Sequence, residues 1–595
     1  YLNINNIMII STLGQAKSLW GKLLSIAFLI AISTLDVSAF PLNSGELNSQ
    51  LIKPNLPLNR QPMQNDEVSI INKADDWGNS TSQDDITLTV KAIFVNGAPE
   101  GVSYKKTNDL ISSLAKSYIN EDITFSRLQD LALKMTKLYR ENGFFLTRVI
   151  IPQQDFKDGN ILLTVIPGTL DSIVINNNAD ISNDLIKAQI PERLKFNEVI
   201  RTDDIDRYAL LLNEIPGTSS KLHLFPGNNP GSTSVLLDID ETSRYRGAFI
   251  IDNYGNKTIS RERLIAELGM SSLAGRGDML GMSFVGSHGK GRVSNLAMDY
   301  SWLTGFDASR LGVGYNRLDY KYYFLDNTFH GYADTVNVKL TQPVIRQNDL
   351  YLTGYTSIYS SRMVDKYPWL FSVYGQSAEK TVLKSSSGLA MRTNFSNNST
   401  LSANIEIVNG KVDYQNKAAE FWNGADLRQT SGYFYQLNTQ LESIFKLNKN
   451  HAIRSNIIGM YSNKNVDSSQ KLAVGGPFSV RSFDSDDIML DSGVIWKGEI
   501  TRDIYLPVST INNMTVFGFY DYAYGQENRK NRTTTGHVLT QENDIYVAAA
   551  GVGVNIFSKF LGDYSITWSQ RMLNKGAQTN PSDKHKLWLS YSINI

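Results

Sequence analysis

Apolar and polar residues alternate at every second position through much of residues 244–595, and this pattern limits the fold more than any other feature. It is clear at residues 336–341, 401–407, 433–441 and 587–595. Successive side chains of a β-strand point to opposite faces, so each such segment predicts a strand with one apolar face. Tyr and Trp near the segment ends, with Gly, Asn and Asp between segments, are typical of a transmembrane β-barrel.

Strands cross a lipid bilayer only as a closed barrel, because an open edge would leave backbone N–H and C=O groups unpaired. The alternating region holds about 350 residues, and about 20 to 24 residues for each strand with its connection give about 16 strands. A soluble β-sandwich is the alternative. The supply of 29 tyrosines, a sequence that ends within a strand pattern, and the export signal described next favour the membrane barrel.

The N-terminal region predicts export. Lys17 and Lys22 precede an apolar run at residues 23–32, and the sequence Val-Ser-Ala follows, ending at Ala39. A basic flank, a short apolar core and a cleavage site of this kind are typical of a signal peptide, so residues 1–39 are expected to be removed. The run is shorter than the about 20 residues that a spanning helix needs, although an N-terminal anchor helix is the alternative.

Two small domains are expected before the barrel. Residues 40–86 are rich in Asn, Gln, Ser and Pro and predict a linker, whereas residues 87–167 predict a strand, two helices and two strands. Residues 168–242 repeat this order. The fold is therefore expected to be multidomain, with two α+β domains before an antiparallel barrel at residues 243–595. In the first domain we expect strands at 88–95, 146–151 and 161–166, and helices at 108–118 and 125–141.

The chain carries no recognisable catalytic or cofactor site. The 58 acidic and 58 basic residues balance, which predicts no nucleic-acid partner, and the absence of cysteine excludes disulfides and zinc-thiolate sites. No H-E-x-x-H, G-x-S-x-G or P-loop pattern is present. The acidic cluster at Asp484, Asp486 and Asp487 favours a solvated loop face over a cation site. We therefore expect no enzyme activity, no metal and no use of ATP.

One late loop has unusual chemistry. Residues 472–483 read L-A-V-G-G-P-F-S-V-R-S-F, in which Gly-Gly-Pro predicts a tight turn. Arg481 keeps its charge at any working pH, so an enclosed Arg481 needs a carboxylate partner. Asp521, in a strand pattern about forty residues later, is a candidate. The alternative is an exposed arginine on a surface hairpin.

Together these features resemble the outer-membrane transporters of two-partner secretion (the TpsB family). These are also called haemolysin secretion/activation proteins and include the contact-dependent inhibition exporters. The likeness covers nearly the whole mature chain. Ser482 and Ala523 replace glycines of the family motifs, and Ile595 replaces a usual terminal aromatic. The matching segments are L-T-R-V-I-I-P at 146–152 with Gln154 and Gly159, D-N-Y-G at 252–255, V-R-S-F at 480–483 and F-Y-D at 519–521.

The resemblance implies a loop that folds back into the barrel, where Arg481 pairs with Asp521 on the inner wall. Phe483 would be the aromatic contact beside this pair. Val480 and Ser482 would complete the motif loop, and Phe519 would open the barrel motif. In the first periplasmic (POTRA) domain, Pro152, Gln154 and Gly159 would be tentative substrate contacts. Strands around 147–154 and 234–240 would offer edges to which a substrate segment adds.

The implied function is export of a large partner exoprotein across the outer membrane of a Gram-negative bacterium. The POTRA domains would bind the N-terminal secretion domain of this haemolysin, adhesin or contact-dependent toxin, which would cross the barrel unfolded. Outer-membrane lipid and, during biogenesis, the barrel assembly machinery are further expected partners. An insertase of the same superfamily is the alternative, but it typically carries more POTRA domains. A porin would need neither these domains nor the loop.

Overall fold

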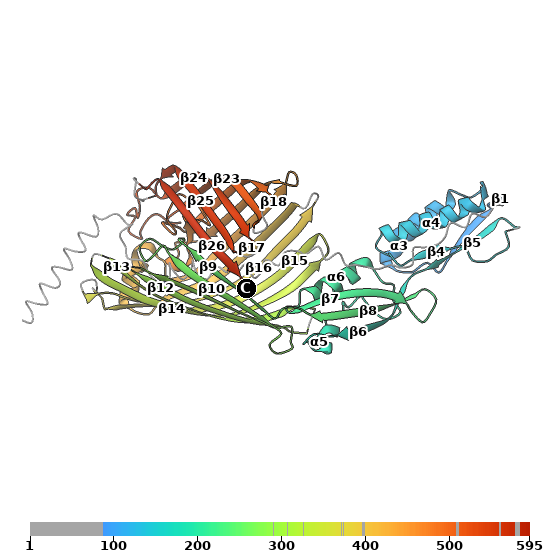
Figure 1. Cartoon of the computed structure of the whole chain (residues 1–595), viewed down its shortest axis with the longest axis horizontal. Coiled ribbons are helices and arrows are strands. Elements are labelled where there is room, and N and C mark those ends of the chain that lie inside the picture. Colours follow the sequence, from blue (N-terminus) through green and yellow to red (C-terminus); the bar gives the residue numbers. More distant parts are fainter. Residues whose placement is uncertain are drawn as a thin grey trace, which may run out of the picture.

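The computed structural model describes Ser44 and residues 87–595, apart from residues 157, 290, 306, 325, 370, 371, 373, 396–398, 507–510, 559, 560 and 578–582. The expected signal peptide and nearly all of the expected linker lie outside the described residues. Two small domains stand at one end of a large barrel (Figure 1). We call this end of the barrel the domain end. None of the described helices has the length and apolar character that crossing a membrane would require.

The barrel has 16 strands, each antiparallel to its neighbours, and it is closed by β9 and β26. The predicted antiparallel barrel of about 16 strands is confirmed. The strands are β9 (Tyr245–Asp252), β10 (Arg263–Ser271), β11 (Met279–His288), β12 (Arg292–Leu303), β13 (Arg310–Phe324), β14 (Asn327–Arg346), β15 (Leu350–Lys366), β16 (Ser377–Phe395), β17 (Ser399–Tyr414), β18 (Gly432–Lys446), β19 (His451–Ser462), β22 (Ser492–Ile504), β23 (Ile511–Gln526), β24 (Asp544–Ser558), β25 (Asp563–Lys575) and β26 (His585–Asn594).

The alternation seen in the sequence separates the outer wall from the inner wall. On β15, Ile358 is 58% exposed and faces outward, whereas its neighbour Ser357 is buried and faces the interior. Apolar side chains such as Val336 and Val338 continue the outer face on β14. This arrangement is the one that a lipid-facing barrel requires.

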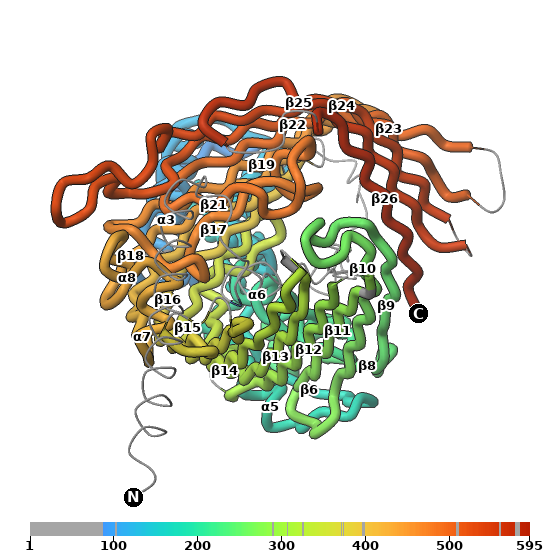
Figure 2. Tube along the Cα trace, turned by 90° about the vertical axis from the view of Figure 1, so that its left-hand side faces the viewer, coloured from blue at the N-terminus to red at the C-terminus, as the bar shows by residue number. Residues whose placement is uncertain are grey.

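The closing seam is short. β9 and β26 form only five residue pairs, from Asp252 with Ser590 to Ala248 with Asn594. Two backbone hydrogen bonds between Gly247 and Ile595 extend the seam by one step. The two strands lie side by side when the barrel is viewed along its axis (Figure 2).

The first small domain is built from β1 (Thr87–Thr89), β2 (Ala92–Asn96), α3 (Val102–Lys116), β3 (Asp122–Thr124), α4 (Phe125–Glu141), β4 (Arg148–Ile150) and β5 (Asn160–Ile166). The prediction of a single strand at 88–95 is wrong. The segment is broken at the fully buried Val90 because β1 pairs with β3, whereas β2 pairs with β5. Helix α3 begins six residues before the expected start at residue 108.

The second small domain has the order strand, two helices and two strands, without the short β1–β3 pair of the first domain. Its helix α6 packs Tyr208 and Leu212 into the core against a three-stranded sheet of order β6-β8-β7. Strand β8 is therefore the central strand. The elements are β6 (Thr169–Asn177), α5 (Asn183–Lys187), α6 (Thr202–Asn213), β7 (Thr218–Pro226) and β8 (Ser232–Glu241).

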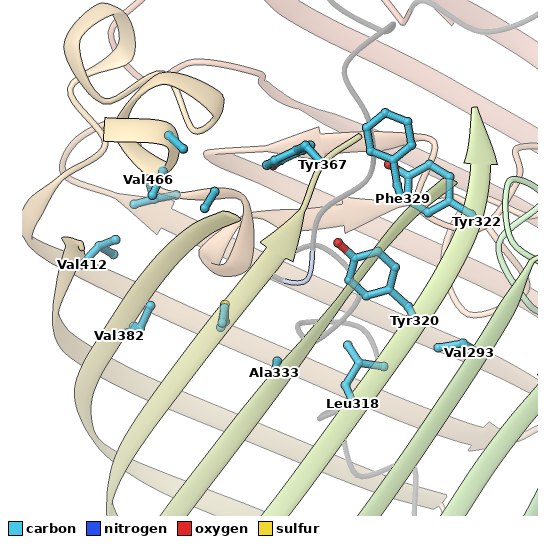
Figure 3. Close-up of a cluster of buried hydrophobic side chains, with 14 of the residues drawn as sticks. Val293, Leu318, Tyr320, Tyr322, Phe329, Ala333, Tyr367, Val382, Val412 and Val466 are labelled. Carbon is cyan, nitrogen blue, oxygen red and sulfur yellow. The ribbon is translucent and has the colours of Figure 1, made fainter. Parts of the chain in front are cut away.

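An apolar cluster lies inside the barrel near the end opposite the small domains. Tyr320, Tyr322, Phe329 and Tyr367 are buried there together (Figure 3). Helix α7 (Lys417–Trp422), from the connection between β17 and β18, packs against the same cluster and is followed by α8 (Ala425–Arg428).

Candidate functional site

The loop between β19 and β22, residues 463–491, is the candidate site, and we call it the motif loop. It forms a small hairpin of β20 (Leu472–Val474) and β21 (Ile488–Leu490), preceded by the 3-10 helix η5 (Ser468–Gln470). Val474, Val480 and Phe483 are fully buried. The Gly-Gly-Pro sequence forms a turn in which Gly475 has φ +117° and Gly476 has φ +84°. The loop is thus a packed element.

Arg481 makes the central contact of this loop with the barrel wall. Its Nη2 and Nε donate to the two carboxylate oxygens of Asp521 on β23, at 2.7 and 2.8 Å. Its Nη1 donates to Oε1 of Glu499 on β22 at 2.7 Å. The side chain of Arg481 is 5% exposed and that of Asp521 is fully buried. This is the two-pronged geometry in which a guanidinium binds a carboxylate most strongly.

The backbone of Arg481 is attached as well. Its N–H donates to Asp521 at 3.1 Å, and its carbonyl oxygen accepts from Ser569 Oγ at 2.6 Å and from Trp588 Nε1 at 2.7 Å. Ser569 lies on β25 and Trp588 on β26. One residue of the loop therefore contacts four barrel strands.

The aromatic neighbour of Arg481 differs from the one expected. The ring of Phe519 on β23 lies 3.5 Å from the Arg481 guanidinium carbon, whereas Phe483 lies under Arg571 at 4.5 Å. The cause is a tight turn, in which the N–H of Phe483 donates to the carbonyl of Val480. This turn separates the side chains at 481 and 483. Phe483 is therefore a buried anchor of the loop.

The residues that replace motif glycines fit their positions without backbone strain. The backbone of Ser482 does not adopt a positive φ, and its side chain is fully buried. Ala523 is 1% exposed within β23 and lies between Ile495 and Val547 of the neighbouring strands. A small side chain is accommodated at both positions.

The acidic cluster after the motif is not a solvated face, so that expectation is wrong. Asp484 is 2% exposed, and its carboxylate lies 2.7 Å from Arg261, 3.0 Å from Lys257 and 2.9 Å from Lys586. Asp487 also pairs with Lys257, at 3.2 Å. The local sequence gave no signal for this arrangement because the partner cations are more than 90 residues away along the chain.

Asp484 is charged in this environment. Burial alone would raise the pKa of its carboxyl, but hydrogen bonds and attraction from Lys586 and Lys257 hold that pKa below its ordinary value. Because the folded pKa is depressed, the stabilisation is present above the unfolded value of about 4 and is lost only as the pH falls through the folded value. The contact is therefore expected to persist at neutral and mildly acidic pH.

Asp484 also bridges the seam of the barrel. Lys586 belongs to β26, the last strand, whereas Lys257 and Arg261 lie in the connection that follows β9, the first strand. Next to it, Ser485 Oγ donates to the carbonyl of Tyr254 at 2.7 Å in the same connection. The motif loop therefore holds together the two strands that close the barrel.

Replacing Asp484 by asparagine is expected to loosen this closure. The change leaves Lys586, which is 6% exposed, with less compensation, and losing one partner of a buried ion pair costs about 3 to 5 kcal/mol. The measurement is ion conductance of the purified protein in planar bilayers, which should rise several-fold. Asp426→Asn, at an exposed position in α8, is the control. Equal conductance in the two variants would contradict the bridging role.

A second buried ion pair attaches the root of the motif loop to the opposite wall. Lys380 on β16 and Asp467 are 1% and 0% exposed, with 2.8 Å between Nζ and Oδ1. Asn423, after α7, accepts from the same ammonium at 2.9 Å, and Tyr414 donates to Asp467 at 2.9 Å. The loop is thus held from both sides of the barrel.

The expected substrate contacts of the first domain are largely engaged within it. The Gln154 side chain pairs with both backbone groups of Leu162 on β5, at 2.7 and 2.8 Å. Gly159 is buried with φ +73°, and a Cβ there would lie 2.5 Å from the carbonyl of Thr89. Pro152 accepts a longer bond from Gln154, at 3.3 Å. These contacts within the domain explain all three residues, and no substrate contact is needed to explain them.

Of the two expected sheet edges, one stands. Strand β4 pairs only with β5 and ends the sheet of the first domain. The prediction that residues 234–240 form a free edge is wrong because β8 is paired on both sides, with β6 and β7. Strand addition in the second domain is therefore restricted to β6 or β7.

The second domain is fixed to the barrel by ion pairs. Arg346 at the end of β14 is 7% exposed and pairs with Glu214, which caps α6, with 3.1 Å between Nη2 and Oε2. Arg207 on α6 binds Asp307, between β12 and β13, at 2.8 Å. Both contacts lie at the domain end of the barrel.

Removing both arginines, as Arg207→Ala with Arg346→Ala, is expected to let this domain swing relative to the barrel. The double change removes one half-buried and one buried ion pair, which together contribute about 2 to 4 kcal/mol to holding the domain against the barrel. The measurement is the distance distribution between spin labels on Lys221→Cys and Lys446→Cys, which the absence of native cysteine permits. It should broaden, and the exposed Glu192→Ala should leave it unchanged. An unchanged distribution in the double variant would refute this role.

The fold and the site define a transporter-type barrel of the outer membrane, with POTRA domains before it and a loop attached inside it. Comparison with known proteins gives the family. The sequence model of the haemolysin secretion/activation protein family ShlB/FhaC/HecB matches residues 231–556, and that of the ShlB-type POTRA domain matches residues 88–168. The chain belongs to this family, the outer-membrane transporters of two-partner secretion.

Individual relatives agree with this assignment. The chain is 27% identical over 485 residues to the heme/hemopexin transporter protein HuxB of Haemophilus influenzae, covering 81% of this chain and 83% of HuxB. It is 23% identical over 484 residues to the outer membrane transporter CdiB of Dickeya dadantii, covering 76% and 78%.

Solved structures share the fold. CdiB from Escherichia coli matches with a TM-score of 0.72 at 17% identity, covering 93% of this chain and 99% of CdiB. CdiB from Acinetobacter baumannii matches with a TM-score of 0.64 at 15% identity, covering 94% and 100%. The protein is located in the outer membrane of a Gram-negative bacterium with its POTRA domains in the periplasm, so the domain end of the barrel is the periplasmic end.

Proposed function

We propose that this protein exports a large partner exoprotein, of the haemolysin, adhesin or contact-dependent toxin type. The observation that carries the proposal is the motif loop, which is folded inside the barrel yet attached to the wall mainly through side chains that could exchange their partners. Arg481 and Asp484 make these attachments without any covalent link. A loop held in this way can be released and restored, as a gate requires.

The periplasmic domains supply the capture step. The free edge of β4 offers backbone groups to which an extended segment of the partner's N-terminal secretion domain can add as a strand. Main-chain pairing of this kind gives affinity with little demand on sequence. The second domain is held at the barrel entrance through Arg346 and Glu214, so a captured segment would be delivered to the mouth.

The partner would cross unfolded, after the motif loop yields. Folding outside the cell would draw the chain through, so the transporter would need neither ATP nor a catalytic site of its own. Biogenesis would require the barrel assembly machinery, and the apolar outer wall would contact outer-membrane lipid.

Co-expression tests this proposal. A candidate partner exoprotein, taken from a neighbouring gene, would be expressed with and without this chain, and the culture medium would be assayed for the secreted partner. Secretion that requires this chain is the expected result. Unchanged secretion in its absence, with other barrel proteins failing to assemble, would overturn the proposal in favour of an insertase.

A further inference from the structure

Three tyrosines line the inner face of β15 at intervals of four residues: Tyr351, Tyr355 and Tyr359. Side chains at even spacing share one face of a strand, and Ile358, on the other face, is 58% exposed on the outer wall. At about 3.3 Å per residue the row extends over about 26 Å. It therefore follows the barrel wall for most of the membrane thickness.

Each of these rings has a cation over it. The Arg346 guanidinium lies 5.3 Å from the centre of the Tyr351 ring, Lys339 lies 5.0 Å from Tyr355, and Lys384 lies 5.2 Å from Tyr359. These are favourable cation–π distances. We call these six residues the tyrosine track.

The middle of the track lies flat against the wall. A Cβ at Gly388 on β16 would lie 2.5 Å from the ring atoms of Tyr355, so only glycine leaves room for the ring there. The Tyr355 hydroxyl donates to Asn404 Oδ1 at 2.9 Å, which fixes the ring across two further strands. The track is therefore a fixed surface.

Both ends of the track meet other functional parts of the molecule. At the periplasmic end Arg346 is the residue that pairs with Glu214 of the second POTRA domain. Beyond Tyr359, the inner face of β15 continues through Ser361 and Met363 to Asp365, which accepts a hydrogen bond from Tyr320 of the apolar cluster (Figure 3). One face of β15 thus leads from the entrance to this cluster.

The same strand already binds a backbone group from a distant part of the chain. Ser44 is fully buried, and its backbone N–H donates to Asp365 Oδ1 on β15 at 2.7 Å. Tyr320 donates to the same carboxylate. At this point the inner face of β15 therefore binds a backbone N–H through a carboxylate.

We propose that the tyrosine track is the surface along which the extended partner polypeptide moves through the barrel. The inference rests on the proposed export function and adds the path. Rings and cations in alternation give weak contacts to many side chains and to backbone carbonyls, without selecting one sequence. Transport needs such repeated weak sites, because a single strong site would retain the chain.

Site-specific photo-crosslinking in intact cells tests the track. A benzoylphenylalanine residue replaces Tyr355 or Tyr359, with Ile358 as the outward-facing control one residue away. The probe is the co-expressed exoprotein fused to a stably folded C-terminal domain, which stalls it in transit. Cross-links from 355 and 359, and none from 358, are expected.

A kinetic test accompanies the cross-linking. Tyr355→Ala combined with Tyr359→Ala should slow secretion about tenfold. Tyr433→Ala is the matched control, because Tyr433 also lies under a lysine, Lys411 at 5.8 Å, but is 71% exposed on the outer wall. Heat-modifiable electrophoretic mobility verifies that each variant forms a folded barrel.

The outcomes separate the path from the function. If the unmodified chain secretes the partner but no cross-link forms from 355 or 359, or cross-links form equally from 358, and the double variant secretes normally, the track is refuted and export stands. If the unmodified chain does not secrete the partner, both proposals fail.

Discussion

Replacing Arg481 by alanine is expected to reduce secretion of the partner by at least about tenfold while the barrel still assembles. The change removes three side-chain hydrogen bonds, two to Asp521 and one to Glu499, and it leaves Asp521 fully buried without its cation. An uncompensated buried charge costs about 3 to 5 kcal/mol. This cost falls on the motif loop and not on the strand pairing, so loop position fails first.

A graded series identifies what the arginine supplies. Arg481→Lys keeps the charge but loses the fork that binds both oxygens of Asp521, so it should secrete poorly. Glu499→Gln should have a smaller effect than Asp521→Asn, because Glu499 makes one of the contacts and is 22% exposed. Arg502→Ala, at an exposed position of β22, is the matched control. Secretion at the unmodified level in Arg481→Ala would eliminate the proposed role of this pair.

Gly475→Ala is expected to be the most damaging single-methyl change in the loop. Gly475 has φ +117°, which alanine rarely adopts, and its new Cβ would lie 2.1 Å from the backbone carbonyl oxygen of Asp484. A backbone atom cannot move aside as a flexible side chain can, so the turn must open and carry Asp484 away from its three cations. Protease sensitivity of the motif loop in otherwise folded barrels should rise strongly.

Gly518→Ala provides the comparison. Gly518 lies on β23, three residues from Asp521, and a Cβ there would meet no atom within 4 Å. This variant should resist protease as the unmodified protein does. If both alanine variants behave alike, the tight turn at Gly475 does not control the loop.

The barrel could be predicted because its signal is repeated along the sequence. In each strand, the alternation of polar and apolar residues shows which side chains face inward and which face outward. The number of strands then follows from the length of the alternating region. Helix α4 was equally readable, since Leu128, Leu131 and Met135 form one buried face. Asp521 was a candidate partner because an enclosed arginine needs a carboxylate, the resemblance to family motifs favoured the pair, and the structure places the two side chains in contact.

Contacts between distant segments could not be predicted. Asp484 looked like part of a solvated cluster because its cations, Lys257 and Lys586, lie in the first barrel connection and the last strand. The central position of β8 followed from pairing on both sides, which the length of a strand does not reveal. The contact of Phe483 with Arg481 was predicted wrongly because the sequence does not reveal the tight turn from Val480 to Phe483, which separates the two side chains.

The attachments of the motif loop have a mechanical consequence. Contacts from β16, β22, β23, β25 and β26 reach a single segment that crosses the interior, so the loop acts as an internal strut. A tube braced from within keeps a fixed cross-section, and one without its brace can change from an ellipse toward a circle at little cost to strand pairing. Release of the loop would therefore enlarge the passage in two ways at once, by vacating space and by allowing the wall itself to become rounder.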